Sequence, residues 1–114
     1  MLTEQAIQDA VRRVVAVARQ PLKVILFGSY ARGNATDISD LDLMVVEREL
    51  PDAGAETIRL NDALAHLDVD VDLLVYSEQE FNQRRHWCST PVYWAMREGK
   101  VLYEHRQCRC RSTH

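Results

Sequence analysis

The sequence predicts a single α/β (α+β) domain in which a small β-sheet is flanked by helices. Three observations support this fold class. The 114 residues are enough for one hydrophobic core. Segments with apolar residues at helical spacing alternate with short apolar runs rich in β-branched residues. Glycine, proline and helix-capping residues separate these segments. We therefore expect one domain over residues 1–104, followed by a basic C-terminal tail over 105–114 that lacks periodicity and is disordered.

The first half of the predicted domain begins with an amphipathic helix. Thr3 is its expected N-cap, and the helix is predicted to end near Gln20, because a proline follows at position 21. Residues 24–27 form a short apolar run that predicts a strand. The Gly28-Ser29 pair ends this strand, and residues 30–32 are expected to form a single helical turn.

The second half alternates strands and helices in the same way. The periodicity and the turn signals predict, in order, a strand over 40–46, a loop over 47–55, a helix over 56–67, a strand over 68–75, a helix from 77 to 85 or 87, a helix over 90–99 and an edge strand over 101–103. Capping residues define both late helices: Ser77 and Glu80 have the spacing of a capping box, and Thr90 precedes a proline.

Composition restricts the classes of protein to which this chain can belong. Apolar residues make up 46% and charged residues 27%, as in soluble globular domains. The net charge of −3 argues against direct nucleic-acid binding. No apolar run is long enough to span a membrane, and no signal-peptide core is present, so we expect a cytoplasmic protein with no membrane partner. The three cysteines lack the spacing of a disulfide framework.

The Gly28-Ser29 turn and the carboxylates that follow it are the most informative feature of the sequence. Backbone N–H groups at the start of a helical turn, together with the Ser29 hydroxyl, can hold phosphate oxygens. Asp40 and Asp42 are two residues apart in a predicted strand, so both should point to one face. Two adjacent carboxylates repel each other unless a cation neutralises them, and magnesium binds such oxygen ligands together with substrate phosphates.

Gly28-Ser29, ten intervening residues and Asp40-x-Asp42 resemble the signature of the nucleotidyltransferase superfamily that includes polymerase β. The compact chain resembles the minimal nucleotidyltransferases (MNT), in particular the antitoxin-type, MntA-like proteins that pair with HEPN-domain ribonuclease toxins. The resemblance covers roughly residues 5–104. It implies a polymerase β palm-like fold with a mixed β-sheet.

The resemblance also implies roles for individual residues. The family's third aspartate lies in the strand after Asp40-x-Asp42, just before an apolar run. Asp72 matches this place better than Asp68 or Asp70, although a two-residue shift in register would select Asp70. Asp40, Asp42 and Asp72 would then be the catalytic and metal-binding residues for two Mg²⁺ ions. Gly28 and Ser29 would bind the β and γ phosphates of ATP. Arg32 either assists them or faces solvent.

The resemblance implies magnesium-dependent transfer of AMP from ATP to a protein hydroxyl. In the antitoxin-type group the acceptor would be a tyrosine of the cognate HEPN toxin, which would form a hetero-oligomer with this chain and lose its ribonuclease activity. One alternative is a non-catalytic binding module that neutralises its partner by direct contact through the apolar segment 92–96. Transfer to a small molecule is disfavoured, because such enzymes generally need a further substrate-binding domain.

Overall fold

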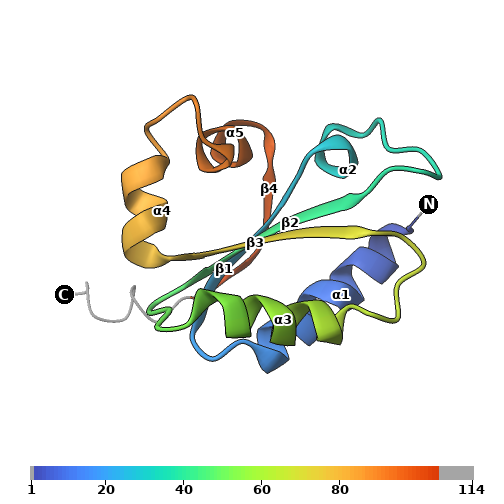
Figure 1. The fold of residues 1–114 in the computed structure, drawn as a ribbon. Coiled ribbons are helices and arrows are strands. Elements are labelled where there is room, and N and C mark those ends of the chain that lie inside the picture. Colours follow the sequence, from blue (N-terminus) through green and yellow to red (C-terminus); the bar gives the residue numbers. More distant parts are fainter. Residues whose placement is uncertain (1, 106–114) are drawn as a thin grey trace.

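The computed structural model describes residues 2–105, so the predicted tail lies outside the described residues, apart from His105. The fold is an α/β arrangement of one sheet and helices on both of its faces, as predicted (Figure 1). Its elements, in chain order, are α1 (Glu4–Val17), β1 (Pro21–Phe27), α2 (Ser29–Arg32), β2 (Leu41–Glu47), α3 (Ala53–Ala63), β3 (Val71–Ser77), α4 (Glu78–Arg84), α5 (Pro91–Glu98) and β4 (Lys100–Glu104).

The four strands form a mixed sheet in the order β3-β2-β1-β4. β1 is antiparallel to both of its neighbours, β2 and β4. β2 and β3 are parallel, so the chain between them must cross from one end of the sheet to the other, and α3 makes this crossover. The predicted last strand is confirmed as an edge strand.

Two helices cover each face of the sheet. α1 and α3 lie on one face, and α4 and α5 lie on the other (Figure 1). Alternate residues of β2 supply both cores: Leu41, Leu43 and Val45 pack toward α1 and α3, whereas Met44 and Val46 pack with Phe81 of α4 and Val92 of α5. Asp42 shares the second face with Met44 and Val46, because side chains alternate between the two faces along a strand.

Polar side chains set the first turns of the helices as the sequence predicts. The Thr3 hydroxyl accepts the backbone N–H of Ala6 at 3.1 Å. Ser77 and Glu80 form a reciprocal capping box at the start of α4. Thr90 caps α5, where a proline occupies the first helical position. These local interactions explain why the predicted starts of α1, α4 and α5 are confirmed.

Several other boundaries differ from the prediction. β1 begins at Pro21 rather than at residue 24, and α3 ends at Ala63 rather than at residue 67. α1 ends at Val17 rather than near Gln20, because the chain already turns to extended geometry at Ala18 before it enters β1 at Pro21. α3 begins at Ala53, inside the predicted loop 47–55, because the Asp52 carboxylate accepts the N–H of Ala55 and caps the helix there.

The predicted strand 68–75 starts later than expected. β3 begins at Val71, and residues 68–70 form the approach to it from α3. β3 pairs in parallel with β2, and the first paired residues are Leu41 of β2 and Val71 of β3. Asp40 and Asp70 therefore lie just before their strands rather than within them. Within residues 2–105, no helix is long and apolar enough to cross a membrane.

Candidate active site

The candidate site forms where β1 ends in a glycine and β2 begins. Gly28 has φ +76°, a conformation that side chains rarely adopt, and it ends β1 and begins α2. A Cβ atom on Gly28 would lie 2.0 Å from Oδ2 of Asp42. The Asp42 carboxylate therefore packs against the backbone of the Gly-Ser turn, and only glycine leaves room for it.

Strand register places a second carboxylate beside Asp42. Asp42 is the second residue of β2 and pairs with Phe27 of β1 on one side. On the other side it pairs in parallel with Asp72, the second residue of β3. Residues paired in this way point to the same face of a sheet. The structure thus brings Asp42 and Asp72 together and leaves them on the face that carries α4 and α5.

The two carboxyl groups interact strongly. Partial burial, together with the negative charges of Asp72 and Asp40, raises the pKa of Asp42 to about 6. A hydrogen bond between the Asp42 and Asp72 carboxyl groups acts in the same direction, whereas the positive charge of Arg32 acts against it. Two neighbouring carboxyl groups of this kind share a proton or bind a cation, because two ionised carboxylates side by side repel each other.

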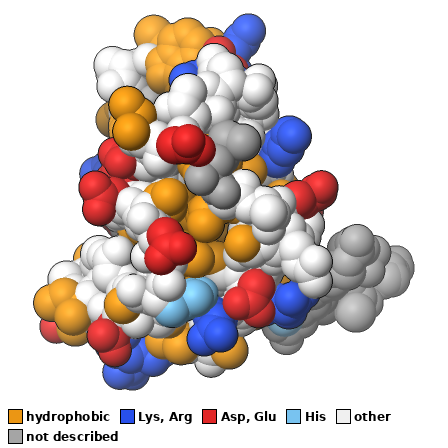
Figure 2. Space-filling view, turned by 90° about the vertical axis from the view of Figure 1, so that its right-hand side faces the viewer, with side chains coloured by type: hydrophobic (Ala, Val, Ile, Leu, Met, Phe, Trp, Pro, Cys, Tyr) orange, Lys and Arg blue, Asp and Glu red, His pale blue; other side chains and the backbone are white. Residues whose placement is uncertain are grey.

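The other predicted site residues surround this pair. Ser29 and Arg32 are the first and last residues of α2, and Arg32 is exposed. Asp40 is exposed and lies just before β2. Its negative charge acts on the pKa of Asp42, whereas Asp72 acts through both its charge and a hydrogen bond. Figure 2 views this end of the molecule and shows acidic side chains spread around exposed hydrophobic ones.

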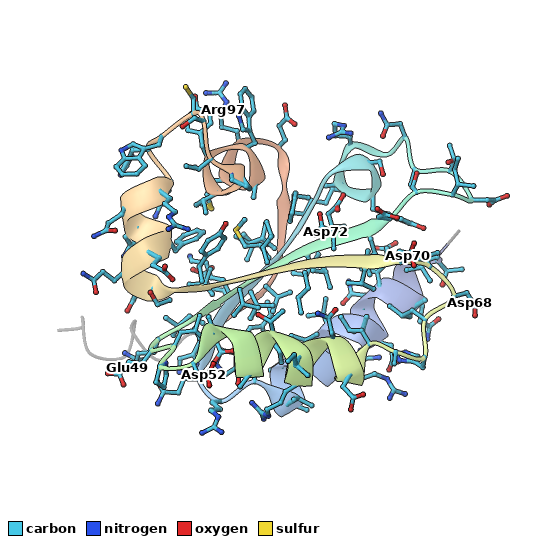
Figure 3. All side chains as sticks on the ribbon, viewed as in Figure 1. Glu49, Asp52, Asp68, Asp70, Asp72 and Arg97 are labelled. Atoms are coloured by element: carbon cyan, nitrogen blue, oxygen red, sulfur yellow. The ribbon has the colours of Figure 1, made fainter. Side chains whose placement is uncertain are left out.

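Asp68 and Asp70 do not join the site. Both are exposed and lie in the segment that leads into β3, at a distance from Asp72 along the same edge of the molecule (Figure 3). The backbone carbonyl of Asp70 accepts the N–H of Leu41, which aligns the starts of β2 and β3. The observed register therefore selects Asp72 over Asp70 as the neighbour of Asp42.

The donor set suits a hard divalent cation that is held jointly by protein and substrate. In the described part of the chain, no three His, Cys, Asp or Glu side chains gather closely enough to hold a metal ion by themselves. Magnesium, however, commonly binds through one or two carboxylates together with phosphate oxygens. The Asp42–Asp72 pair supplies two such carboxylates next to the Gly28 turn, and a cation there would relieve their repulsion.

Sequence reasoning did not anticipate the contact between Gly28 and the Asp42 carboxylate. The two residues are separated by a polar loop, and their contact depends on the antiparallel pairing of β1 with β2. The available signal was a glycine directly after a buried strand, which often marks a close approach of another group to the backbone.

Comparison with known proteins identifies the family of the chain. Residues 10–107 match the family model described as "Polymerase beta, Nucleotidyltransferase". The chain is 34% identical to the "Putative protein adenylyltransferase MJ0604" of Methanocaldococcus jannaschii, over 90% of this chain and 100% of that protein.

Solved structures have the same fold. One is the crystal structure of a toxin-antitoxin with AMP-PNP, which aligns with a TM-score of 0.66 at 22% identity over 89% of this chain and 76% of the other. Another is the tri-AMPylated Shewanella oneidensis HEPN toxin in complex with an MNT antitoxin, which aligns with a TM-score of 0.61 at 19% identity over 94% of this chain and 77% of the other.

Proposed function

Since the chain belongs to the polymerase β-type nucleotidyltransferase family, we propose that it transfers AMP from ATP to a hydroxyl group of a protein. The observation that carries this proposal is the Asp42 carboxylate, which packs against the Gly28 backbone and pairs with Asp72. This arrangement places paired acidic oxygens next to a turn suited to phosphates. Nucleotidyl transfer needs both features at one point, because a charged polyphosphate must be held while it is attacked.

Within this proposal, the α2 side of the site holds the triphosphate. Gly28 and Ser29 bind the β and γ phosphates through backbone N–H groups and the Ser29 hydroxyl. Arg32 is exposed at the end of α2 and close enough to act on the charge of Asp42, so its guanidinium can neutralise phosphate charge at the same place. The acceptor oxygen attacks the α phosphorus, the bond to the β phosphate breaks, and pyrophosphate leaves.

Asp42 and Asp72, assisted by Asp40, would hold two Mg²⁺ ions together with the phosphates of ATP. When bound, Mg²⁺ supplies charge neutralisation on the phosphates and lowers the pKa of the attacking hydroxyl. The chain's own contribution is to orient the carboxylates through the β2–β3 register and to hold them at the Gly28 turn. The raised pKa of Asp42 means that this carboxyl binds a proton readily and exchanges it for a cation.

The proposed acceptor is a tyrosine of a cognate HEPN-domain toxin, with this chain as its antitoxin. Two comparisons support this assignment. The M. jannaschii relative is named as an adenylyltransferase of proteins, and a structural neighbour is an MNT antitoxin in complex with an AMPylated HEPN toxin. AMP added to a tyrosine would place a bulky anion on the toxin and thereby block its ribonuclease activity.

Labelled ATP tests the proposal. The purified chain is incubated with Mg²⁺ and a lysate of its own host, once with α-labelled and once with γ-labelled ATP. We expect one protein band to acquire the α label and none to acquire the γ label, since the γ phosphate leaves with pyrophosphate. Label from γ-labelled ATP would indicate a kinase. Absence of both labels would overturn the proposed transfer to protein.

A further inference from the structure

Two carboxyl groups are buried at the end of the sheet opposite Asp72. Glu47 is the last residue of β2 and is 0% exposed, and Glu56 lies in the first turn of α3 and is 4% exposed. Glu49 and Asp52, which lie on the loop between them, mark this end in Figure 3. Buried glutamates are rare unless their charge is compensated, so the surroundings of this pair decide its ionisation.

Hydrogen bonds compensate the buried charge of Glu56 much better than that of Glu47. Glu56 accepts the backbone N–H of Arg19 at 3.2 Å and a short hydrogen bond from the Arg59 guanidinium, which also donates to the Val17 carbonyl at 2.6 Å. From the N–H donors of residues 2–105, Glu47 accepts one hydrogen bond, from the backbone N–H of Gln20 to Oε1 at 3.3 Å. Its second oxygen, Oε2, is buried and receives no hydrogen bond from an N–H donor in the described residues.

The carboxyl group of Glu56 can act as the hydrogen-bond partner that Glu47 lacks. Glu47 and Glu56 line the same small pocket, and a hydrogen bond between their carboxyl groups contributes to the raised pKa of Glu47. Two ionised carboxylates cannot make this bond, because neither has a proton to donate. One protonated and one ionised carboxyl group can make it, and the orphaned Oε2 then becomes a donor.

The charges around the pair favour one proton on Glu47. Arg59 lies beside Glu56, and the exposed Arg19 has its Nε 3.8 Å from Glu56 Oε1. Both cations therefore stabilise Glu56 as the ionised partner. The loop adds further negative charge, since a pocket of about 190 Å³ beside the pair is lined by Glu49 and Asp52 as well as by these arginines.

We propose that Glu47 and Glu56 share a single proton, held by Glu47 and donated to the Glu56 carboxylate, and that this pair is a pH-sensitive latch between β2 and α3. The latch also includes the turn between α1 and β1, through the N–H groups of Arg19 and Gln20. It thus closes the far end of the β2–α3–β3 crossover. Loss of the proton leaves two buried negative charges beside the half-buried guanidinium of Arg59.

The direction of the pH effect follows from the two glutamates. Burial, and then the hydrogen bond with Glu56, raises the pKa of Glu47 from 4.5 to about 7. Burial also acts to raise the pKa of Glu56, but hydrogen bonds from Glu47 and Arg19 and the charge of Arg59 outweigh it and lower this pKa. The stability that Glu47 contributes is therefore complete below pH 4.5 and is lost as the pH rises through about 7.

A matched pair of variants tests the latch. Glu47→Gln keeps a hydrogen-bond donor toward Glu56 but cannot ionise, and Asp62→Asn removes an exposed carboxylate later in α3. The unfolding constants of wild type and both variants are measured by urea denaturation from pH 5 to pH 8. Unfolding of the wild type and of Asp62→Asn should release one more proton than unfolding of Glu47→Gln. Between pH 5 and pH 7, the unfolding constants of wild type and Asp62→Asn should therefore increase with pH more steeply than that of Glu47→Gln. The difference in slope should be about tenfold per pH unit.

Parallel pH profiles for wild type and Glu47→Gln would overturn the proposal. Amide hydrogen exchange of the wild type supplies a second test that needs no variant. After correction for intrinsic exchange, the opening of α3 amides near Glu56 should increase as the pH rises from 5 to 8. Opening that is independent of pH over this range would contradict a latch that depends on one proton.

Discussion

At the residue scale, the site depends on one glycine and two carboxylates. The spacing of Asp40-x-Asp42 predicted that both aspartates share a strand face, but Asp40 lies just before β2 and the pair that forms is Asp42 with Asp72. This pairing depends on the register between β2 and β3, which no local pattern determines. The sequence could select Asp72 only through a family resemblance, because Asp68, Asp70 and Asp72 have the same local alternation.

Substitution of Gly28 should separate a collision from simple backbone strain. Gly28→Ala places a Cβ atom 2.0 Å from Asp42 Oδ2, so the carboxylate must move and transfer should fall by about 100-fold or more. Gly33→Ala is the matched control, since Gly33 has a similar φ of +81° but no atom within 4 Å of the added Cβ. Gly33→Ala should lose about 1–2 kcal/mol of stability, because Gly33 is in the left-handed region with ψ +15°. Gly28→Ala should lose more stability, because the ψ of −155° at Gly28 lies in a region that is essentially restricted to glycine. Equal activity losses, measured by label transfer, would contradict the role of the close approach.

Asp42→Asn should abolish transfer and leave the fold intact. The pKa of Asp42 is raised to about 6, so ionisation of this carboxyl destabilises the fold as the pH rises from 4 through 6. The amide removes that effect, and in the absence of metal the variant should be more stable than wild type at pH 8, by on the order of 1 kcal/mol. Urea denaturation at pH 5 and pH 8 measures the difference. A variant that is less stable at pH 8 would argue against repulsion within the acid pair.

At the element scale, the sequence predicted which segments are helices and strands better than it predicted where they end. Starts with a Ser or Thr cap were placed correctly, because the cap is a local interaction. The start of α3 was missed because Pro51 and Gly54 signalled a loop, although Asp52 caps the helix between them. The burial of Glu47 and Glu56 was also missed, because it depends on partners from α1, β2 and α3 that meet only in the folded chain.

The capping box of α4 offers a test at this scale. The Ser77 side chain accepts the N–H of Glu80 at 3.2 Å, and the Glu80 carboxylate accepts the N–H of Ser77 at the same distance. Ser77→Ala removes the first of these bonds and should lower the free energy of unfolding by about 1 kcal/mol. Ser89→Ala, at an exposed position before α5, is the control and should change stability little. A similar urea midpoint for both variants would show that the box does not stabilise α4.

At the scale of the whole molecule, the sheet brings the functional groups to one end and the buried glutamates to the other. α3 joins these two ends, because it connects the strand of Asp42 to the strand of Asp72. A small mixed sheet flanked by helices was predicted from the alternating segments and from a family resemblance. The strand order was not predictable from local patterns, since it depends on which strand edges meet in the fold.

Magnesium should stabilise the molecule through the acid pair. A divalent cation between Asp42 and Asp72 relieves their repulsion, so millimolar Mg²⁺ should raise the melting temperature of wild type by a few degrees at pH 8. Asp42→Asn should show little or no increase under the same conditions. Chelation by EDTA should abolish transfer by wild type without unfolding it, as judged by circular dichroism. An equal rise in melting temperature for both proteins would place the cation elsewhere.

Transfer and partner binding, measured on the same proteins, distinguish a catalytic chain from one that acts by contact alone. Wild type and the Asp40→Asn/Asp42→Asn variant are each incubated with α-labelled ATP, Mg²⁺ and host lysate, and the protein that each one captures is identified by mass. We expect both proteins to capture the same partner and only wild type to label it. A partner that remains unlabelled by wild type, yet is inhibited equally by both proteins, would contradict catalysis and favour neutralisation by contact.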